Sequence, residues 1–168
     1  MSGTGWSCDP ASEEDWPWIT RESEELGGPV LVSSGSLHDL RHCPAVVVSE
    51  GAERAGFLVY RVAGDMLEIL AIKAVRPRLG AGSALMDEAE RIAELSRCRE
   101  ICLTTTNDNL DALRFYQRRG FAVRAYHIGG FREILRLKGS DTDQVPLGLH
   151  GIPIRDSIDL GKCLRGSS

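Results

Sequence analysis

The sequence predicts an α/β fold in which helices flank a mixed, mostly antiparallel sheet. Strand-like runs follow one another closely between residues 45 and 74, which is typical of an antiparallel meander. After residue 80 the apolar residues change to a helical period, and strands and helices then alternate to about residue 128. A meander followed by strand–helix units indicates a sheet with both kinds of pairing.

The composition is that of an ordinary globular protein. The chain has 168 residues, 42% of them hydrophobic and 26% charged, and we expect a single domain over residues 1–168. The net charge of −4 gives no basic excess, which disfavours a nucleic-acid partner. No apolar run approaches the roughly 20 residues that span a bilayer, and the N-terminus lacks the features of a signal peptide. We therefore expect a cytoplasmic protein with no membrane partner. The 5 cysteines are irregularly spaced, which disfavours a disulfide framework and a metal site.

The N-terminal half contains one helix and the meander. Residues 1–11 are either a loose arm or a short first strand. Ser12, followed by three acidic residues, starts a helix that ends at the glycine pair 27–28. The segment 30–43 is a short strand or a loop. The strands of the meander are expected at 45–49, 55–63 and 66–74, joined by tight turns.

The C-terminal half alternates helices and strands. Helical spacing predicts one helix from Gly80 to about Ser96 and another at 109–119, which Gly120 ends. The remaining elements are a strand at 100–105, a strand at 121–128, a short helix at 131–138, a polar loop at 140–151 and a final strand within 152–164. That final strand completes the sheet within the chain or with a second copy, so a homodimer is one expectation.

A glycine-rich turn precedes the first of these helices. The run GAGS at 80–83 opens the helix, whose first N–H groups lack partners within it and lie at the positive end of its dipole. Glycine lets a phosphate approach the backbone, and Arg76 and Arg78 add positive charge. The turn therefore predicts an anion site, although close packing of a helix on a strand selects the same glycines. No Gly-Lys-Ser/Thr follows, and the third glycine of a dinucleotide fingerprint is missing.

A second motif follows one strand later. Residues 104–121 read TTTNDNLDALRFYQRRGF, with Asn109, Phe115 and Tyr116 at helical spacing. The pattern N-x-x-A-x-x-F-Y-x-x-x-G-F resembles the late motif of the Gcn5-related N-acetyltransferase (GNAT) superfamily. The turn at 78–83 resembles that family's acetyl-CoA motif, Gln/Arg-x-x-Gly-x-Gly/Ala.

The resemblance extends over about residues 12–128. The end of the chain at 151–156 is also similar to a group of uncharacterised bacterial GNAT proteins. One position departs from the pattern, because Pro77 stands where the family has Gln or Arg. Binding of the cofactor would therefore depend on backbone amides, and Arg76 or Arg78 would replace the missing side chain.

The resemblance implies the GNAT fold and direct transfer of an acetyl group from acetyl-CoA to a small-molecule or peptide amine, with no metal. Tyr116 would be the general acid that protonates the departing thiolate, and Glu68 the base. On a regular strand Glu68 shares a face with Leu70 and Ile72. The implied cofactor-binding positions are Ile69, Leu70, Ala71, Ile72, Lys73, Arg78, Leu79, Gly80, Ala81, Gly82, Ser83 and Asn109.

Alternatives stay open for each role. Tyr116 can be a packed aromatic, Asn109 a helix cap, and Glu68 a solvent-facing carboxylate or a salt-bridge partner. His127, at the end of a strand, is a further proton acceptor. A non-catalytic sensor that binds acyl-CoA is the alternative to an enzyme, and a nucleotide-binding regulatory domain that uses the glycine turn alone is a third hypothesis.

Overall fold

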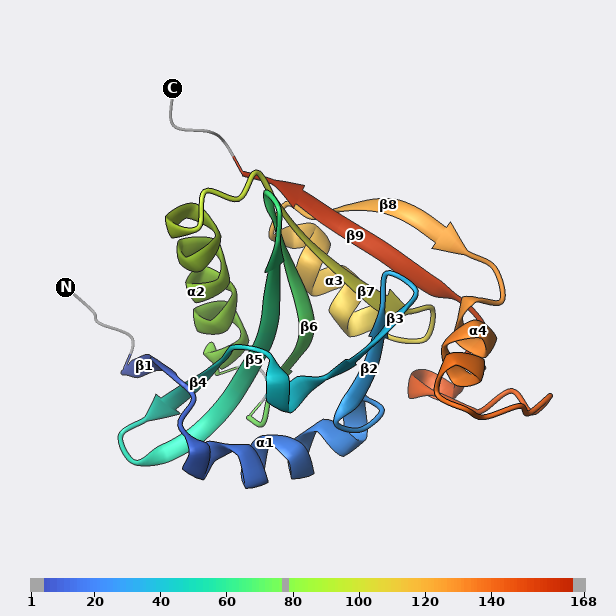
Figure 1. Ribbon diagram of the computed structural model, residues 1–168, viewed down its shortest axis with the longest axis horizontal. Coiled ribbons are helices and arrows are strands. Elements are labelled where there is room, and N and C mark those ends of the chain that lie inside the picture. Colours follow the sequence, from blue (N-terminus) through green and yellow to red (C-terminus); the bar gives the residue numbers. More distant parts are fainter. Residues whose placement is uncertain (1–4, 77–78, 165–168) are drawn as a thin grey trace.

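The protein is described by a computed structural model that covers residues 5–76 and 79–164. Seven of the strands form one sheet in the order β1-β4-β5-β6-β7-β9-β8, and β2 pairs with β3 in a separate hairpin (Figure 1). The strands are β1 (Trp6–Pro10), β2 (Val30–Ser33), β3 (Ser36–Asp39), β4 (Ala45–Glu50), β5 (Glu53–Ala63), β6 (Met66–Ala74), β7 (Glu100–Thr106), β8 (Ala122–His127) and β9 (Ser157–Cys163). The helices are α1 (Trp16–Ser23), α2 (Ala81–Leu95), α3 (Leu110–Arg118) and α4 (Gly130–Leu137).

Pairing in the large sheet is antiparallel except between β6 and β7, as far as the described strands extend. The mixed, mostly antiparallel sheet predicted from the sequence is therefore confirmed. β9 lies between β7 and β8 of its own chain and is antiparallel to both. The final strand thus completes this sheet without a second copy.

Two segments that the sequence left open form strands. Trp6–Pro10 pairs with β4, so the loose-arm alternative is wrong for these residues. The segment 30–43 contains the β2–β3 hairpin, whose turn residues Ser34 and Gly35 both have positive φ (50° and 73°). Positive φ at both turn residues is typical of the type I′ turns that join tight hairpins. The hairpin lies in front of the large sheet in Figure 1.

Hydrophobic clusters lie on both faces of the sheet. On one face α2 and α3 pack over β4, β5, β6, β7 and β9 and bury Leu58, Leu85 and Leu160 completely. On the other face α1 and the hairpin region cover only β4, β5 and β6, around Ile19 and Phe57. Part of that second face, over β7, β9 and β8, therefore remains outside the hydrophobic cluster, and polar side chains occupy it.

β6 and β7 separate part-way along their length. Their parallel pairing runs only from Met66 to Ile69 on β6, although β6 continues to Ala74 and β7 to Thr106. From Leu70 onward, the edge of β6 that faces β7 has no strand partner among the described residues. An open strand edge of this kind can accept an extended ligand as an additional strand.

A β-bulge lies at the same point. Across β5, Ile69 pairs with Tyr60 and Ala71 with Val59, so Leu70 is the extra residue. An extra residue reverses the faces of those that follow it. Ile72 accordingly packs with the α2 cluster, whereas Leu70 packs with the α1 cluster. The expectation that Glu68, Leu70 and Ile72 share one face is therefore wrong for Ile72.

Candidate active site

The first turn of α2 lies beside the C-terminal end of β6 and beside α3. Gly80 caps the helix at φ 95°, a left-handed conformation that favours glycine. A Cβ placed on Gly82 would lie 3.7 Å from Phe115 Cζ on α3 and 3.9 Å from Ala74 Cβ at the end of β6. The helix N-terminus, the open strand end and α3 thus meet at Gly82, where the first amides of α2 are free of intrahelical bonds.

The sequence predicted two arginines near this turn, Arg76 and Arg78, as anion ligands. Arg76 forms an ion pair with Glu53 and approaches Glu50 to 3.9 Å, both at the β4–β5 turn. Its charge is therefore already engaged by acidic neighbours. Arg78, one of the predicted cofactor-binding residues, lies outside the described residues together with Pro77.

Asn109 caps α3. Its Oδ1 atom accepts a hydrogen bond from the Ala112 amide at 3.2 Å, so the capping role is confirmed. The side-chain amide nitrogen has no hydrogen bond to any described residue and retains its donors for a ligand. Cap and ligand contact use different atoms, so both roles are compatible.

Variants of Asn109 separate these two roles. Asn109→Ala removes the cap and is expected to cost about 1 kcal/mol of unfolding free energy. Asn109→Ser retains a capping oxygen, so its stability stays near wild type, while the amide donor is lost. If the amide binds acetyl-CoA, calorimetry will show weaker binding in both variants. Wild-type affinity in Asn109→Ser would restrict Asn109 to the capping role.

Tyr116 lies in the interior between α3 and the sheet. It is 7% exposed and packs against Phe115 and Phe121, with ring centroids 5.4 and 5.7 Å away. Its hydroxyl has no hydrogen bond to any described residue, and burial raises the pKa of the phenol above its usual value. The packed-aromatic role is confirmed, and the phenol remains a protonated donor at neutral pH.

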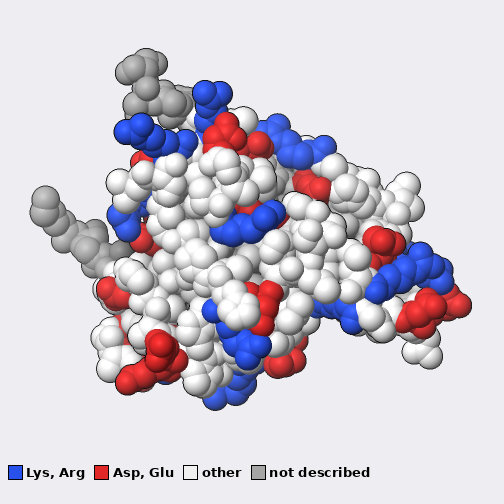
Figure 2. Space-filling view, in the orientation of Figure 1, with Lys and Arg blue, Asp and Glu red and all other residues white. Residues whose placement is uncertain are grey.

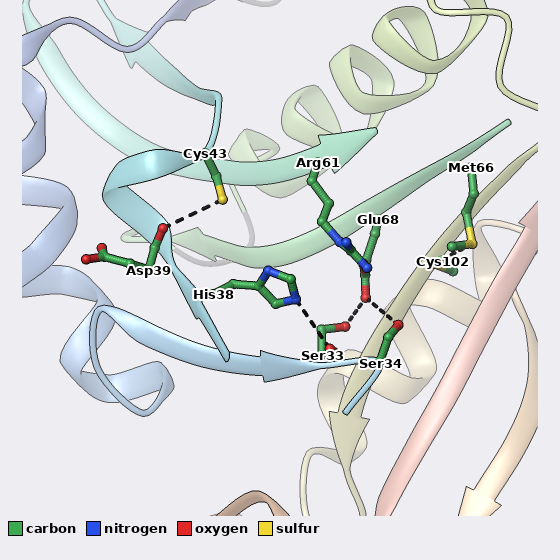
Figure 3. Close-up of polar contacts among 9 residues, drawn as sticks. All are labelled: Ser33, Ser34, His38, Asp39, Cys43, Arg61, Met66, Glu68 and Cys102. Carbon is green, nitrogen blue, oxygen red and sulfur yellow. Dashed lines mark hydrogen bonds and ion pairs between the residues drawn. The ribbon is translucent and has the colours of Figure 1, made fainter. Parts of the chain in front are cut away.

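Glu68 lies on β6 just before the strands separate, on the face covered by the hairpin. It is 2% exposed, so the solvent-facing alternative is wrong. Its carboxylate forms an ion pair with Arg61 Nε and accepts hydrogen bonds from Ser33 Oγ and, at 3.4 Å, from Ser34 Oγ (Figure 3). The salt-bridge alternative is therefore confirmed. Glu68 thus has three polar partners, one from β5 and two from the hairpin.

Cys102 lies opposite Glu68 on β7. Burial, followed by the charges of Glu68, Glu100 and Asp159, raises the pKa of this thiol to about 12. The thiolate is the nucleophilic form of cysteine, and at neutral pH it is scarcely populated here. The site therefore lacks an activated nucleophile at Cys102.

Sequence reasoning did not identify Arg61 or the two serines. A signal for Arg61 existed, because the tight turn at Gly64-Asp65 sets a register in which Arg61 faces Glu68. No local signal existed for Ser33 and Ser34, whose contact with Glu68 depends on how the hairpin folds over the sheet.

His127 contributes to a polar chain on the same side of the sheet. Its Nε2 lies 2.6 Å from Asp159 Oδ2, and Thr104 Oγ1 donates to Asp159 Oδ1 at 2.7 Å. Thr104 lies one residue beyond the last pair of β6 and β7, so this chain lines the region where the two strands separate. The imidazole is thereby oriented by a carboxylate.

Comparison with known proteins identifies the family. The family model described as the acetyltransferase (GNAT) family matches residues 8–121. The chain belongs to the GNAT family. An uncharacterised Bacillus subtilis protein, YdhI, is 34% identical over 118 residues, which cover 70% of this chain and 71% of YdhI.

Solved structures of GNAT proteins share the fold. One is a GNAT acetyltransferase from Elizabethkingia anophelis with acetyl-CoA bound, with a TM-score of 0.71, 18% identity and coverage of 95% of this chain and 99% of the other. A second is a B. subtilis acetyltransferase in complex with CoA, with a TM-score of 0.68, 21% identity and the same coverage. The GNAT fold predicted from the two motifs is therefore confirmed.

The described residues show neither a metal-binding cluster nor a membrane-spanning helix. Within residues 5–76 and 79–164, no group of three or more His, Cys, Asp or Glu side chains could hold a metal ion. None of the helices in these ranges is long and apolar enough to cross a membrane. On the face seen in Figure 2, basic and acidic side chains are interspersed, and no basic stripe crosses it.

Proposed function

We propose that this chain is an acetyl-CoA-dependent N-acetyltransferase that transfers the acetyl group directly to an amine. The observation that carries the proposal is the separation of β6 and β7 after Ile69, next to the N-terminus of α2. A GNAT family member with an open strand edge beside a helix N-terminus has the two features that an acyl-CoA needs. The whole chain is proposed to act as one acetyltransferase domain.

The cofactor is proposed to bind along the open edge of β6. The pantetheine arm would pair with the backbone from Ile69 to Lys73 as an additional strand. The pyrophosphate would accept hydrogen bonds from the amides between Leu79 and Ser83, where the helix dipole favours an anion. Because Arg76 is engaged by Glu53, these amides would provide most of the grip.

The chemistry is proposed to need no covalent enzyme intermediate. The amine nitrogen attacks the thioester carbonyl, the C–S bond breaks, and Tyr116 donates a proton to the leaving sulfur. The raised pKa of Tyr116 keeps the phenol protonated in the ground state. The proton is transferred when the C–S bond breaks and negative charge develops on the sulfur. Glu68 would bind the acceptor's ammonium group and pass one of its protons to solvent through water, and a second proton from the attacking nitrogen would restore the Tyr116 phenol.

Release of free thiol from acetyl-CoA tests the proposal. The expected result is amine-dependent thiol release, with an N-acetylated product detected by mass spectrometry. Binding of acetyl-CoA without turnover of any amine would favour the acyl-CoA sensor. Calorimetry separates the third hypothesis, since a nucleotide-binding domain predicts tighter binding of ATP or NAD than of CoA. Action in the cytoplasm and formation of a homodimer stay predictions.

A further inference from the structure

Arg61 has hydrogen-bond donors that the ion pair with Glu68 does not use. Its Nε atom contacts the Glu68 carboxylate, while Nη1 and Nη2 have no hydrogen bond to any residue of the described ranges. The side chain is 31% exposed, against 3% for that of Glu68. The pair therefore has a buried anion and an outer cation whose donors remain available.

The position of the pair relates it to the proposed reaction. Arg61 and Glu68 are direct partners across β5 and β6, and their side chains meet beneath the hairpin tip (Figure 3). Glu68 precedes by one residue the point at which β6 leaves β7, and Leu70 at the bulge shares its face. An amine held at Glu68 would therefore lie next to the strand edge proposed for the thioester.

Two neighbouring carboxylates, Glu100 and Asp159, have partners of their own. Glu100 pairs with Arg124 at 3.2 Å, and Asp159 lies 2.6 Å from His127. The donors of Arg61 are thus not claimed by these acids. The remaining hydrogen-bond partners of Glu68 are two hydroxyl groups, of which Ser34 is at 3.4 Å, close to the limit of hydrogen bonding, and can yield to an ammonium group.

We infer that the acceptor is an amine that carries a carboxylate on the adjacent carbon, the arrangement of an α-amino acid. This inference rests on the proposed function and specifies its substrate class. The ammonium group would bind Glu68 and Ser34, and the carboxylate would accept hydrogen bonds from Nη1 and Nη2 of Arg61. A planar guanidinium suits this role because its parallel donors match the two oxygens of a carboxylate.

Charge balance favours the same class of acceptor. Glu68 and Arg61 together are neutral, and a zwitterion leaves the sum unchanged while each of its charges meets an opposite one. An amine without a carboxylate would leave the Arg61 donors unmatched. In the balanced reaction the ammonium loses two protons, one to the CoA thiol through Tyr116 and one to solvent, and an N-acetyl amino acid forms.

Matched acceptors test the inference in the wild-type enzyme. Proteinogenic L-α-amino acids are compared with their α-amides and with the corresponding decarboxylated amines, using thiol release from acetyl-CoA. Loss of a charged hydrogen-bond pair predicts a kcat/KM that is about 10- to 100-fold higher for the carboxylate form of the best acceptor. Equal or better turnover of the amides or decarboxylated amines would overturn the inference and leave the proposed function intact.

An Arg61→Lys variant tests the assigned residue. Lysine keeps a positive charge beside buried Glu68, so folding should be retained, which thermal melting checks. The KM for the amino acid is expected to rise about 10- to 100-fold, with the KM for acetyl-CoA unchanged. Arg124→Lys, on the edge strand β8, is the matched control and should behave as wild type. An unchanged acceptor KM in Arg61→Lys would refute the assignment.

A binding measurement separates failure of the inference from failure of the proposed function. With CoA present, an N-acetyl amino acid is titrated into the protein and compared with its amide. The expected result is tighter binding of the carboxylate, lost in Arg61→Lys. If acetyl-CoA binds but no amine of either kind is acetylated, the proposed function is wrong and the inference fails with it.

Discussion

Tyr116→Phe is expected to lower kcat by about 100-fold while leaving the KM for acetyl-CoA near the wild-type value. The phenol is buried and protonated and has no hydrogen-bond partner among the described residues, so its proton is available to a bound ligand. Removing its oxygen leaves the ring contacts with Phe115 and Phe121 in place. The melting temperature should therefore stay constant, and thiol release under saturating acetyl-CoA measures the effect.

The pH profile adds a second readout to the same variant. Burial raises the pKa of Tyr116 above the usual value near 10 for tyrosine, so the phenol stays protonated at neutral pH. Ionisation of Tyr116 should therefore cause no loss of rate below about pH 10. Tyr60→Phe is the matched control, since Tyr60 packs against the same hydrophobic cluster from β5 and should tolerate the change. Wild-type activity in Tyr116→Phe would show that Tyr116 only packs.

Local patterns predicted most of the elements. The strands of the meander and the starts of α2 and α3 follow from alternation, glycine positions and a capping residue, each of which depends on residues close in sequence. The motif positions Gly80, Gly82 and Asn109 were found for the same reason, because they are helix N-terminal residues. The positions of β1 and β9 in the sheet depend on pairing between distant segments, and the sequence left both partly open.

The bulge at Leu70 and the hairpin contact explain what sequence reasoning missed. The run Ile69–Lys73 contains no glycine or proline to signal an extra residue, so strict alternation placed Ile72 on the wrong face. The same limit applies to Glu68, whose burial depends on Arg61 from β5 and on Ser33 from the hairpin. A carboxylate on a strand cannot reveal from its neighbours in sequence whether another element covers it.

The glycine turn supports the second large prediction, that Gly82→Val will weaken acetyl-CoA binding about 10- to 100-fold. A Cβ at this position makes ordinary contacts with Phe115 and Ala74, so the two methyl groups of valine would crowd the first turn of α2 where it meets the end of β6. The amides of that turn are proposed to hold the pyrophosphate. The added methyl groups would hold the phosphate away from the amides of α2 and lengthen charged hydrogen bonds.

Gly82→Val should lower the affinity for acetyl-CoA without lowering the free energy of unfolding. Valine is a better helix former than glycine, so the unfolding free energy should be unchanged or slightly higher. Ser83→Ala is the matched control: it keeps the backbone amide and removes only the hydroxyl, so calorimetry should give near wild-type affinity for CoA. A large loss in Ser83→Ala would show that the hydroxyl, and not the amide, holds the phosphate. Wild-type affinity in Gly82→Val would mean that the pyrophosphate does not lie against the first turn of α2, and the proposed position of the cofactor would then be wrong.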